Sequence, residues 1–180
     1  MRLIAEMRGC TRCPVLAATR TQVVVGQTPP GARLLVVGEA PGAQEDLLGE
    51  PFVGRSGKLL DRLLEEVGLP RREVAVLNTV KCRPPDNRVP TRAETEHCRP
   101  WLEAQLVEVA PALVVTLGLS ATGWFLGRVT LGNVRGRVHE AGGQRVLPTY
   151  HPAAALRGGP DGEPLRLLRE DLALAARLAA

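Results

Sequence analysis

The chain has 180 residues, of which 44% are hydrophobic and only 3% are aromatic. This length and apolar content suffice for one compact core, so we expect a single domain over residues 1–180. Lys and Arg exceed Asp and Glu by 23 − 19 = 4, which is compatible with a polyanionic partner but does not require one. No run of about 18 apolar residues and no signal-peptide pattern occurs, which excludes most membrane and secreted classes. We therefore expect a soluble, cytoplasmic protein.

Four cysteines form the first motif along the chain. Cys10 and Cys13 make a C-x-x-C pair, and Cys82 and Cys98 follow much later. Four thiolates are the number that one closed metal centre needs, and both zinc and an iron–sulfur cluster suit them. The long gap is unlike the two close pairs of a zinc ribbon, which mildly favours the cluster. Buried cysteines without a ligand are the alternative.

The stretch 34–42, which reads LLVVGEAPG, has the pattern of a buried parallel strand ending in a rigid loop with one carboxylate, Glu39. Ligands of open α/β sheets bind beyond the carboxyl ends of such strands, so we expect the active site here. A long loop follows, with the acidic Glu45 and with Phe52 between two glycines. Loops of this length are usually functional. Phe52 either presents its ring to the cleft or anchors the loop in the core.

Leucines at helical spacing predict a helix from about Ser56 to Val67, with Ser56 as its N-cap. A second strand at 74–77 ends at Asn78, whose amide either reaches the same cleft as Glu39 or only forms a turn. We expect residues 81–92 to form an exposed basic loop that either holds phosphates or stays solvated. Its basic residues are Lys81, Arg83, Arg88 and Arg92.

Thr91 and Glu94 form a capping-box pattern that predicts a helix from about Arg92 to Val109. A third strand is expected at 112–117, followed by a short helix.

A hairpin around Gly142 and Gly143 leads to a last central strand that ends just before His151. Pro152 then stands at a helix-start position. A leucine- and arginine-rich helix over Pro164 to Ala179 ends the sequence.

The expected strand ends carry GEAPG with Glu39, NTVKCRPP with Asn78 and HPAAALR with His151, and Phe52 lies in GEPFVGRSGKLLD. With the order of the four cysteines, this set resembles the family 4 uracil-DNA glycosylases, the iron–sulfur branch of the uracil-DNA glycosylase superfamily. The similarity extends from Cys10 to about Arg157. It implies an α/β fold, a three-layer α/β/α sandwich around a four-stranded parallel sheet. A [4Fe–4S] cluster beside it would be held by Cys10, Cys13, Cys82 and Cys98.

The resemblance also implies how uracil is recognised once it is flipped out of the DNA. Phe52 would stack on the base. Asn78 would read its edge, because an amide accepts from N3–H and donates to O4, whereas cytosine reverses both groups. Glu45 would lie near C5, where bulk helps to exclude the methyl group of thymine.

Cleavage of the glycosidic bond should place negative charge on uracil O2. His151 would donate a hydrogen bond to that oxygen, assisted by backbone N–H groups of the turn Gly38-Glu39-Ala40. Glu39 would position the attacking water or stabilise the sugar cation. Some members of the superfamily place an aspartate where this chain has Ala40.

Contacts to DNA phosphates are expected from Lys81, Arg83, Arg88 and Arg157. Leu156 resembles the side chain that fills the vacated stack, with a place in the helix core as its alternative. The implied activity is the excision of uracil from single- and double-stranded DNA by a monomer, which leaves an abasic site.

Two other classes of function compete with this one. A module that traps uracil-containing DNA without turnover would carry a histidine in the loop after the Asn78 strand, and no histidine occurs there before His97. A redox protein that uses the four thiolates would leave Glu39, Asn78 and His151 without a task.

Overall fold

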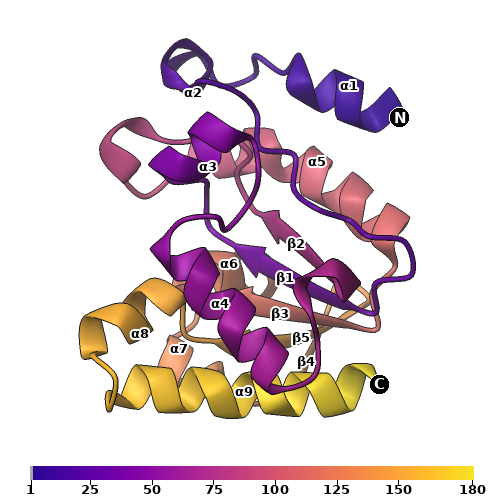
Figure 1. Ribbon diagram of the computed structural model, residues 1–180. Helices are drawn as coiled ribbons and strands as arrows, with labels where there is room; N and C mark the ends of the chain where they lie inside the picture. The colour runs from indigo at the N-terminus through magenta and orange to yellow at the C-terminus, as the bar shows by residue number, and fades with distance from the viewer. Residues whose placement is uncertain (1) are drawn as a thin grey trace.

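The computed structural model describes residues 2–180, and its centre is a five-stranded sheet in the order β2-β1-β3-β5-β4 (Figure 1). The strands are β1 (Leu34–Gly38), β2 (Val74–Asn78), β3 (Leu113–Leu117), β4 (His139–Ala141) and β5 (Gln144–Thr149). Every residue of β1, β2 and β3 is buried. Continuous runs of valine and leucine suit strands that are covered on both faces.

Nine α-helices surround the sheet within the described part of the chain. They are α1 (Arg2–Arg8), α2 (Pro14–Thr19), α3 (Ala43–Leu48), α4 (Arg55–Glu66), α5 (Arg92–Val109), α6 (Gly118–Leu126), α7 (Leu131–Val134), α8 (Pro152–Gly158) and α9 (Glu163–Ala179). Short 3₁₀ turns occupy Arg71–Glu73 and Pro85–Asn87. None of the helices between residues 2 and 180 is long and apolar enough to cross a membrane.

Helices cover both faces of the sheet and complete three layers. Leu34 and Val36 of β1 pack with α4, α8 and α9, whereas Leu35 and Val37 pack with α5 and α6. Successive side chains of a strand point to opposite faces, so one strand supplies both cores. Figure 1 shows α4 and α9 in front of the sheet, with α8 beside them. The expected α/β sandwich is confirmed in this layered form.

The number of strands in the sheet differs from that expectation. The four parallel strands are present, because β1 pairs with β2 and β3, and β3 pairs with β5. The sheet nevertheless has a fifth strand, so the expected total of four was wrong. The short β4 runs antiparallel to β5 because Gly142 and Gly143, with φ of 56° and 76°, turn the chain directly back.

Two other elements differ from the expectations. Helix α4 begins at Arg55 after Gly54, so Ser56 is not its N-cap. The loop after β1 contains the short helix α3, which the sequence pattern did not indicate. The capping box of α5 is confirmed: Thr91 Oγ1 accepts from Glu94 N at 3.2 Å, and Glu94 Oε2 accepts from Thr91 N at 2.8 Å.

Candidate active site and cysteine site

A cleft of about 690 Å³ opens where β1, β2 and β3 end and α8 begins. Its lining contains expected substrate-binding residues from four separate segments: Glu39, Ala40, Glu45, Phe52, Asn78 and His151. Gly38 lies directly against two of them. A Cβ atom at Gly38 would be 2.5 Å from both Asn78 Oδ1 and the Phe52 ring. The structure thus brings the predicted residues together at the predicted edge of the sheet.

Phe52 is held in a conformation that few aromatic residues adopt. Its φ of 54° lies in the left-handed region, and its ring centroid is 5.8 Å from that of His151, with the planes tilted by 33°. Gly57 allows this arrangement, because a Cβ there would lie 1.7 Å from the Phe52 carbonyl oxygen. Backbone strain of this kind persists where the surroundings fix it, often at functional sites. Phe52 therefore has the fixed ring that a stacking platform needs.

Asn78 ends β2 with its side chain buried, at 3% exposure. Its Oδ1 atom finds no hydrogen-bond partner among residues 2–180. A buried polar atom without a partner costs free energy, so such atoms in native proteins call for an explanation. Asn78 itself lines the cleft, so its amide is the polar group that a ligand with complementary hydrogen-bonding groups would meet there.

His151 is the N-cap residue of α8, and the helix fixes its tautomer. Its Nδ1 atom accepts a hydrogen bond from Ala153 N at 3.0 Å, which leaves the ring proton on Nε2. Burial, and next the positive charge of Arg157, lower the pKa of His151 to about 4. The imidazole is therefore neutral near pH 7 and carries one N–H donor on Nε2.

Glu45 uses its carboxylate to hold the loop that carries Phe52. Oε1 accepts from Val53 N at 2.9 Å and Gly54 N at 2.8 Å, and Oε2 accepts from Gly42 N at 3.1 Å. Glu45 therefore lies in the wall of the cleft with three backbone donors on its carboxylate. The sequence predicted its place in the cleft but not these bonds.

Glu39 reaches across the cleft to a residue that the sequence analysis missed. Its Oε2 atom accepts a hydrogen bond from Ser120 Oγ, near the start of α6. The Glu39 carbonyl accepts from Thr79 Oγ1 at 2.7 Å and from Val80 N at 3.0 Å, which ties the β1 turn to the end of β2. Ser120 follows the end of β3 by three residues, and that position is the only signal that could have marked it.

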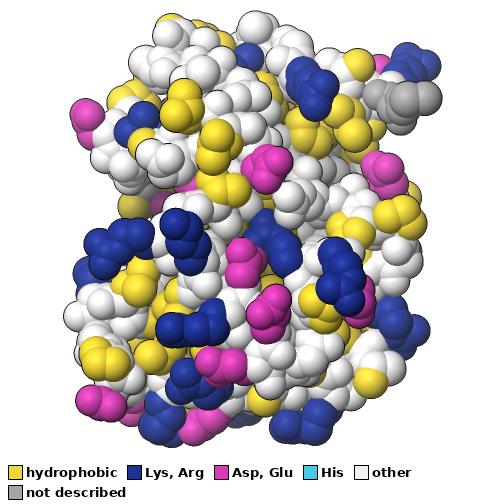
Figure 2. Space-filling model, in the orientation of Figure 1, with side chains coloured by type: hydrophobic (Ala, Val, Ile, Leu, Met, Phe, Trp, Pro, Cys, Tyr) yellow, Lys and Arg dark blue, Asp and Glu magenta, His cyan; other side chains and the backbone are white. Residues whose placement is uncertain are grey.

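The rim of the cleft carries further polar and basic residues. Those not predicted from the sequence as site residues are Arg55, Ser56, Asn87 and Ser120. Arg157 also lines the cleft, as predicted, and Leu156 beside it on α8 is 37% exposed. Figure 2 shows Lys and Arg side chains gathered over the start of α4 and beside α8. Basic charge therefore borders the opening.

The expected exposed basic loop is wrong for Lys81. This side chain is only 1% exposed, because its backbone N–H donates to Cys98 Sγ and its carbonyl accepts from Val24 N, which hold the segment inward. Arg83 Nε donates to Asn87 Oδ1 at 2.7 Å, and Arg88 pairs with Glu94 through two bonds of 2.7 and 2.8 Å. Arg83 and Arg88 are partly exposed, whereas Lys81 cannot reach a phosphate.

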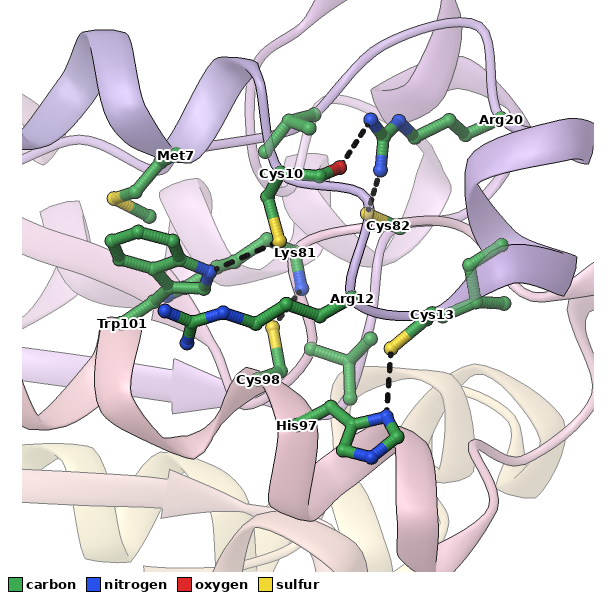
Figure 3. Close-up of a pocket in the computed structure, with 13 residues that line it drawn as sticks. Met7, Cys10, Arg12, Cys13, Arg20, Lys81, Cys82, His97, Cys98 and Trp101 are labelled. Atoms are coloured by element: carbon green, nitrogen blue, oxygen red, sulfur yellow. Dashed lines mark hydrogen bonds between the residues drawn. The ribbon is translucent and has the colours of Figure 1, made fainter.

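The four cysteines come together at a second site, shown in Figure 3. Cys10 and Cys13 approach from the N-terminal segment, Cys82 from the loop after β2 and Cys98 from α5. All four thiols are free within the described chain, and apolar side chains such as Met7 and Val80 surround them. Among residues 2–180, no three His, Cys, Asp or Glu side chains converge closely enough to hold a single metal ion.

Nitrogen atoms approach each of the four sulfur atoms, and three of them are N–H donors. Trp101 Nε1 lies 3.3 Å from Cys10 Sγ, Arg20 Nη1 lies 3.1 Å from Cys82 Sγ, and Lys81 N lies 3.3 Å from Cys98 Sγ. His97 Nδ1 is 3.8 Å from Cys13 Sγ. N–H groups aimed at sulfur stabilise thiolates and are typical of the surroundings of iron–sulfur clusters.

Burial at the same site disfavours the deprotonated form of cysteines that bind no metal. It raises the pKa of Cys98 to about 11 and also raises the pKa values of Cys82 and Cys13. Without a metal the thiols therefore stay protonated, whereas bound metal replaces the protons. Four free thiols with nitrogen donors in an apolar setting fit a polynuclear thiolate-bound centre.

Comparisons with known proteins agree with this geometry. A family model described as the uracil DNA glycosylase superfamily matches residues 25–173. A type-4 uracil-DNA glycosylase of Thermotoga maritima is 43% identical, over 96% of this chain and 91% of the relative. A type-4 enzyme of Saccharolobus solfataricus is 41% identical over 86% and 76%. A type-5 enzyme of Pyrobaculum aerophilum is 34% identical over 83% and 80%. The chain therefore belongs to the uracil-DNA glycosylase superfamily and, within it, to the type-4 family.

Proposed function

We propose that this protein excises uracil from single- and double-stranded DNA, acting as a monomer in the cytoplasm, and leaves an abasic site. The observation that carries the proposal is the buried Asn78, which lines the cleft and whose Oδ1 atom has no hydrogen-bond partner among the described residues. A base can reach such a site only when it is flipped out of the helix.

Recognition of uracil follows from the donors and acceptors of its edge. Asn78 Oδ1 accepts from N3–H, and its amide nitrogen donates to O4. Cytosine presents an acceptor at N3 and an amino group at C4, which leaves both amide atoms unpaired. A mismatch of buried hydrogen-bonding groups gives discrimination on the order of 10⁴-fold. Phe52 supplies the ring on which the base stacks, and Glu45 forms the wall near C5.

The reaction places positive charge on the sugar and negative charge on uracil O2. His151 donates from Nε2 to that oxygen, and its neutral state lets it stabilise the charge without a proton transfer. Preorganised donors of this kind contribute about 3–4 kcal/mol each to the stability of a transition state. Backbone groups of the turn Gly38-Glu39-Ala40 assist, and Glu39 with Ser120 positions the attacking water or stabilises the sugar cation. A cation-like sugar needs only weak activation of water.

A [4Fe–4S] cluster held by Cys10, Cys13, Cys82 and Cys98 completes the proposal. When bound, it would supply a structural crosslink, because it ties the N-terminal segment to the loop that follows β2. Trp101, Arg20, Lys81 and His97 would stabilise its thiolates through the contacts described above.

DNA contacts are proposed for the rim of the cleft. Arg157 and Arg55 line the opening, and Arg83 and Arg88 lie partly exposed beyond it. Leu156 stands next to Arg157 on α8 and would fill the stack that the flipped base leaves.

The test uses purified protein and a labelled oligonucleotide with one uracil, in single- and double-stranded form, followed by alkali. Strand scission at the uracil supports the proposal, and an oligonucleotide that stays intact at several salt concentrations refutes it. The optical spectrum of the same sample tests the cluster. A brown protein with absorbance near 400 nm supports it, and a colourless, zinc-loaded protein purified anaerobically rules it out.

A further inference from the structure

Lys81 is a buried cation for which the structure offers no protein anion. Its side chain is 1% exposed, and none of the ion pairs formed within residues 2–180 includes it. The ammonium group has three N–H donors, but within the described chain Nζ makes a single hydrogen bond, to the Asn78 carbonyl oxygen at 2.8 Å. An uncompensated charge of this kind is strongly unfavourable in a protein interior.

The four-cysteine site provides the missing anion. Lys81 lines the same cavity as Cys10, Cys13, Cys82 and Cys98, and its backbone N–H donates to Cys98 Sγ. A [4Fe–4S] core with four thiolate ligands carries net negative charge, and a cation at its edge is attracted strongly in these apolar surroundings.

The other contact of Lys81 is with the uracil cleft. Asn78 is three residues earlier in the chain, and its carbonyl is the acceptor of the Nζ hydrogen bond. The neighbouring Thr79 N–H donates to the Gly38 carbonyl, so the backbone here is held from both sides. The Asn78 side chain projects from the backbone that Lys81 fixes. One lysine therefore contacts both sites of the molecule.

We infer that Lys81 is a positioning residue that links the two sites: its ammonium group is the buried counter-charge of the cluster and, through the Asn78 carbonyl, fixes the amide that reads uracil. The role of Lys81 as a counter-charge rests on the proposed cluster, and its role in positioning the Asn78 amide rests on the proposed function. Lys81 itself does not contact the substrate.

Two variants separate charge from hydrogen bonding. Lys81→Met keeps the length and apolar stem of the side chain but removes both the charge and the donor. Lys81→Gln removes the charge and keeps a neutral N–H donor. Lys58→Met is the matched control, because Lys58 is the only other lysine of the sequence and is exposed on α4.

Two measurements on the purified, cluster-loaded proteins do not depend on turnover. The first is the midpoint potential of the cluster, and the second is the affinity for free uracil by calorimetry. Loss of a nearby cation disfavours the reduced, more negative cluster, so both Lys81 variants should shift to lower potential while K58M matches the wild type. Uracil should bind roughly tenfold more weakly to K81M, since one hydrogen bond is lost, and K81Q should recover part of this affinity.

The results can overturn the inference in separate ways. An unchanged potential in K81M and K81Q rejects the counter-charge, and an unchanged uracil affinity in K81M rejects the positioning role. If the Lys81 variants do not assemble a cluster, their uracil affinities are compared with that of cluster-free wild type, and equal values reject the positioning role. Wild-type protein that leaves the uracil oligonucleotide intact refutes the proposed function instead, and the potentials still test the counter-charge.

Discussion

Hydrogen bonds within the fold hold the residues that would carry the chemistry. The Ala153 N–H fixes the tautomer of His151, and Lys81 holds the Asn78 carbonyl. Because these partners come from the first turn of α8 and the loop after β2, the fold itself orients both residues. Preorganisation of this kind removes the cost of arranging donors during the reaction.

The neutral state of His151 gives a first prediction. Its pKa is lowered to about 4, below the ordinary value of 6.5, so the ring should stay neutral from pH 8 down to about 5. Long-range ¹H–¹⁵N spectra of the protein labelled at histidine should show an Nε2–H tautomer for His151 that does not change over this range. Titration of the His151 ring near pH 6.5 would contradict the assigned role.

Sequence patterns predicted which residues lie at the cleft better than they predicted which residues are buried. Glu39, Phe52, Asn78 and His151 were predictable because strand ends of a parallel sheet share one edge, and the resemblance named them. Lys81 was placed on the surface because its neighbours are basic and prolines follow it. Its burial depends on bonds to Val24 and Cys98, which are 57 and 17 positions away, and no local pattern reveals such partners.

At the scale of elements, α3 acts as a support for the loop that carries Phe52. Its first turn supplies Glu45, whose carboxylate accepts from the backbone on both sides of the loop. The sequence showed the acidic run but not the helix, because six residues with glycines at both ends give little periodicity. The prediction of Ser56 as the N-cap of α4 was wrong for a related reason: Gly54, whose N–H donates to Glu45, takes the N-cap position.

Replacement of Glu45 tests this support. Glu45→Ala leaves three backbone N–H groups without their acceptor and should lower the free energy of unfolding by about 1–3 kcal/mol. It should also reduce kcat/KM for uracil excision, because Phe52 loses its fixed position. Urea denaturation and steady-state kinetics measure the two effects. Glu45→Gln retains one acceptor oxygen and should be milder, and the exposed Glu50→Ala should resemble the wild type. Equal stability of E45A and E50A would refute the supporting role.

Across the whole molecule, the uracil cleft and the cysteine site are neighbours because the same short segment contributes to both. Asn78 and Cys82 are only four residues apart, one at the end of β2 and the other in the loop that follows. The sequence predicted the parallel strands and the set of cysteines. It could not predict the distance between the two sites, since α5 and the N-terminal segment must first pack against that loop to form the cysteine site.

The basic rim should make DNA binding depend on salt. When the logarithm of the association constant for a duplex is plotted against the logarithm of the salt concentration, the line falls with a slope of about 0.9 per phosphate contact. Arg157→Ala should therefore weaken binding for all sequences alike and reduce the slope by about one unit. Arg177→Ala on α9, whose exposed side chain lies outside the cleft, is the control and should keep the slope. An unchanged slope in R157A would show that Arg157 does not contact a DNA phosphate.

The proposed function depends on the amide of Asn78, which would read uracil in this cleft. It is tested by single-turnover release of free base from oligonucleotides that differ only in carrying one uracil, cytosine or thymine. The wild type should release uracil about 10⁴-fold faster than cytosine and leave thymine in place, and Asn78→Ala should lose most of that rate and of the preference over cytosine. Asn133→Ala, an exposed asparagine, should behave as the wild type. An Asn78→Ala protein that keeps the rate and the preference of the wild type would contradict the account.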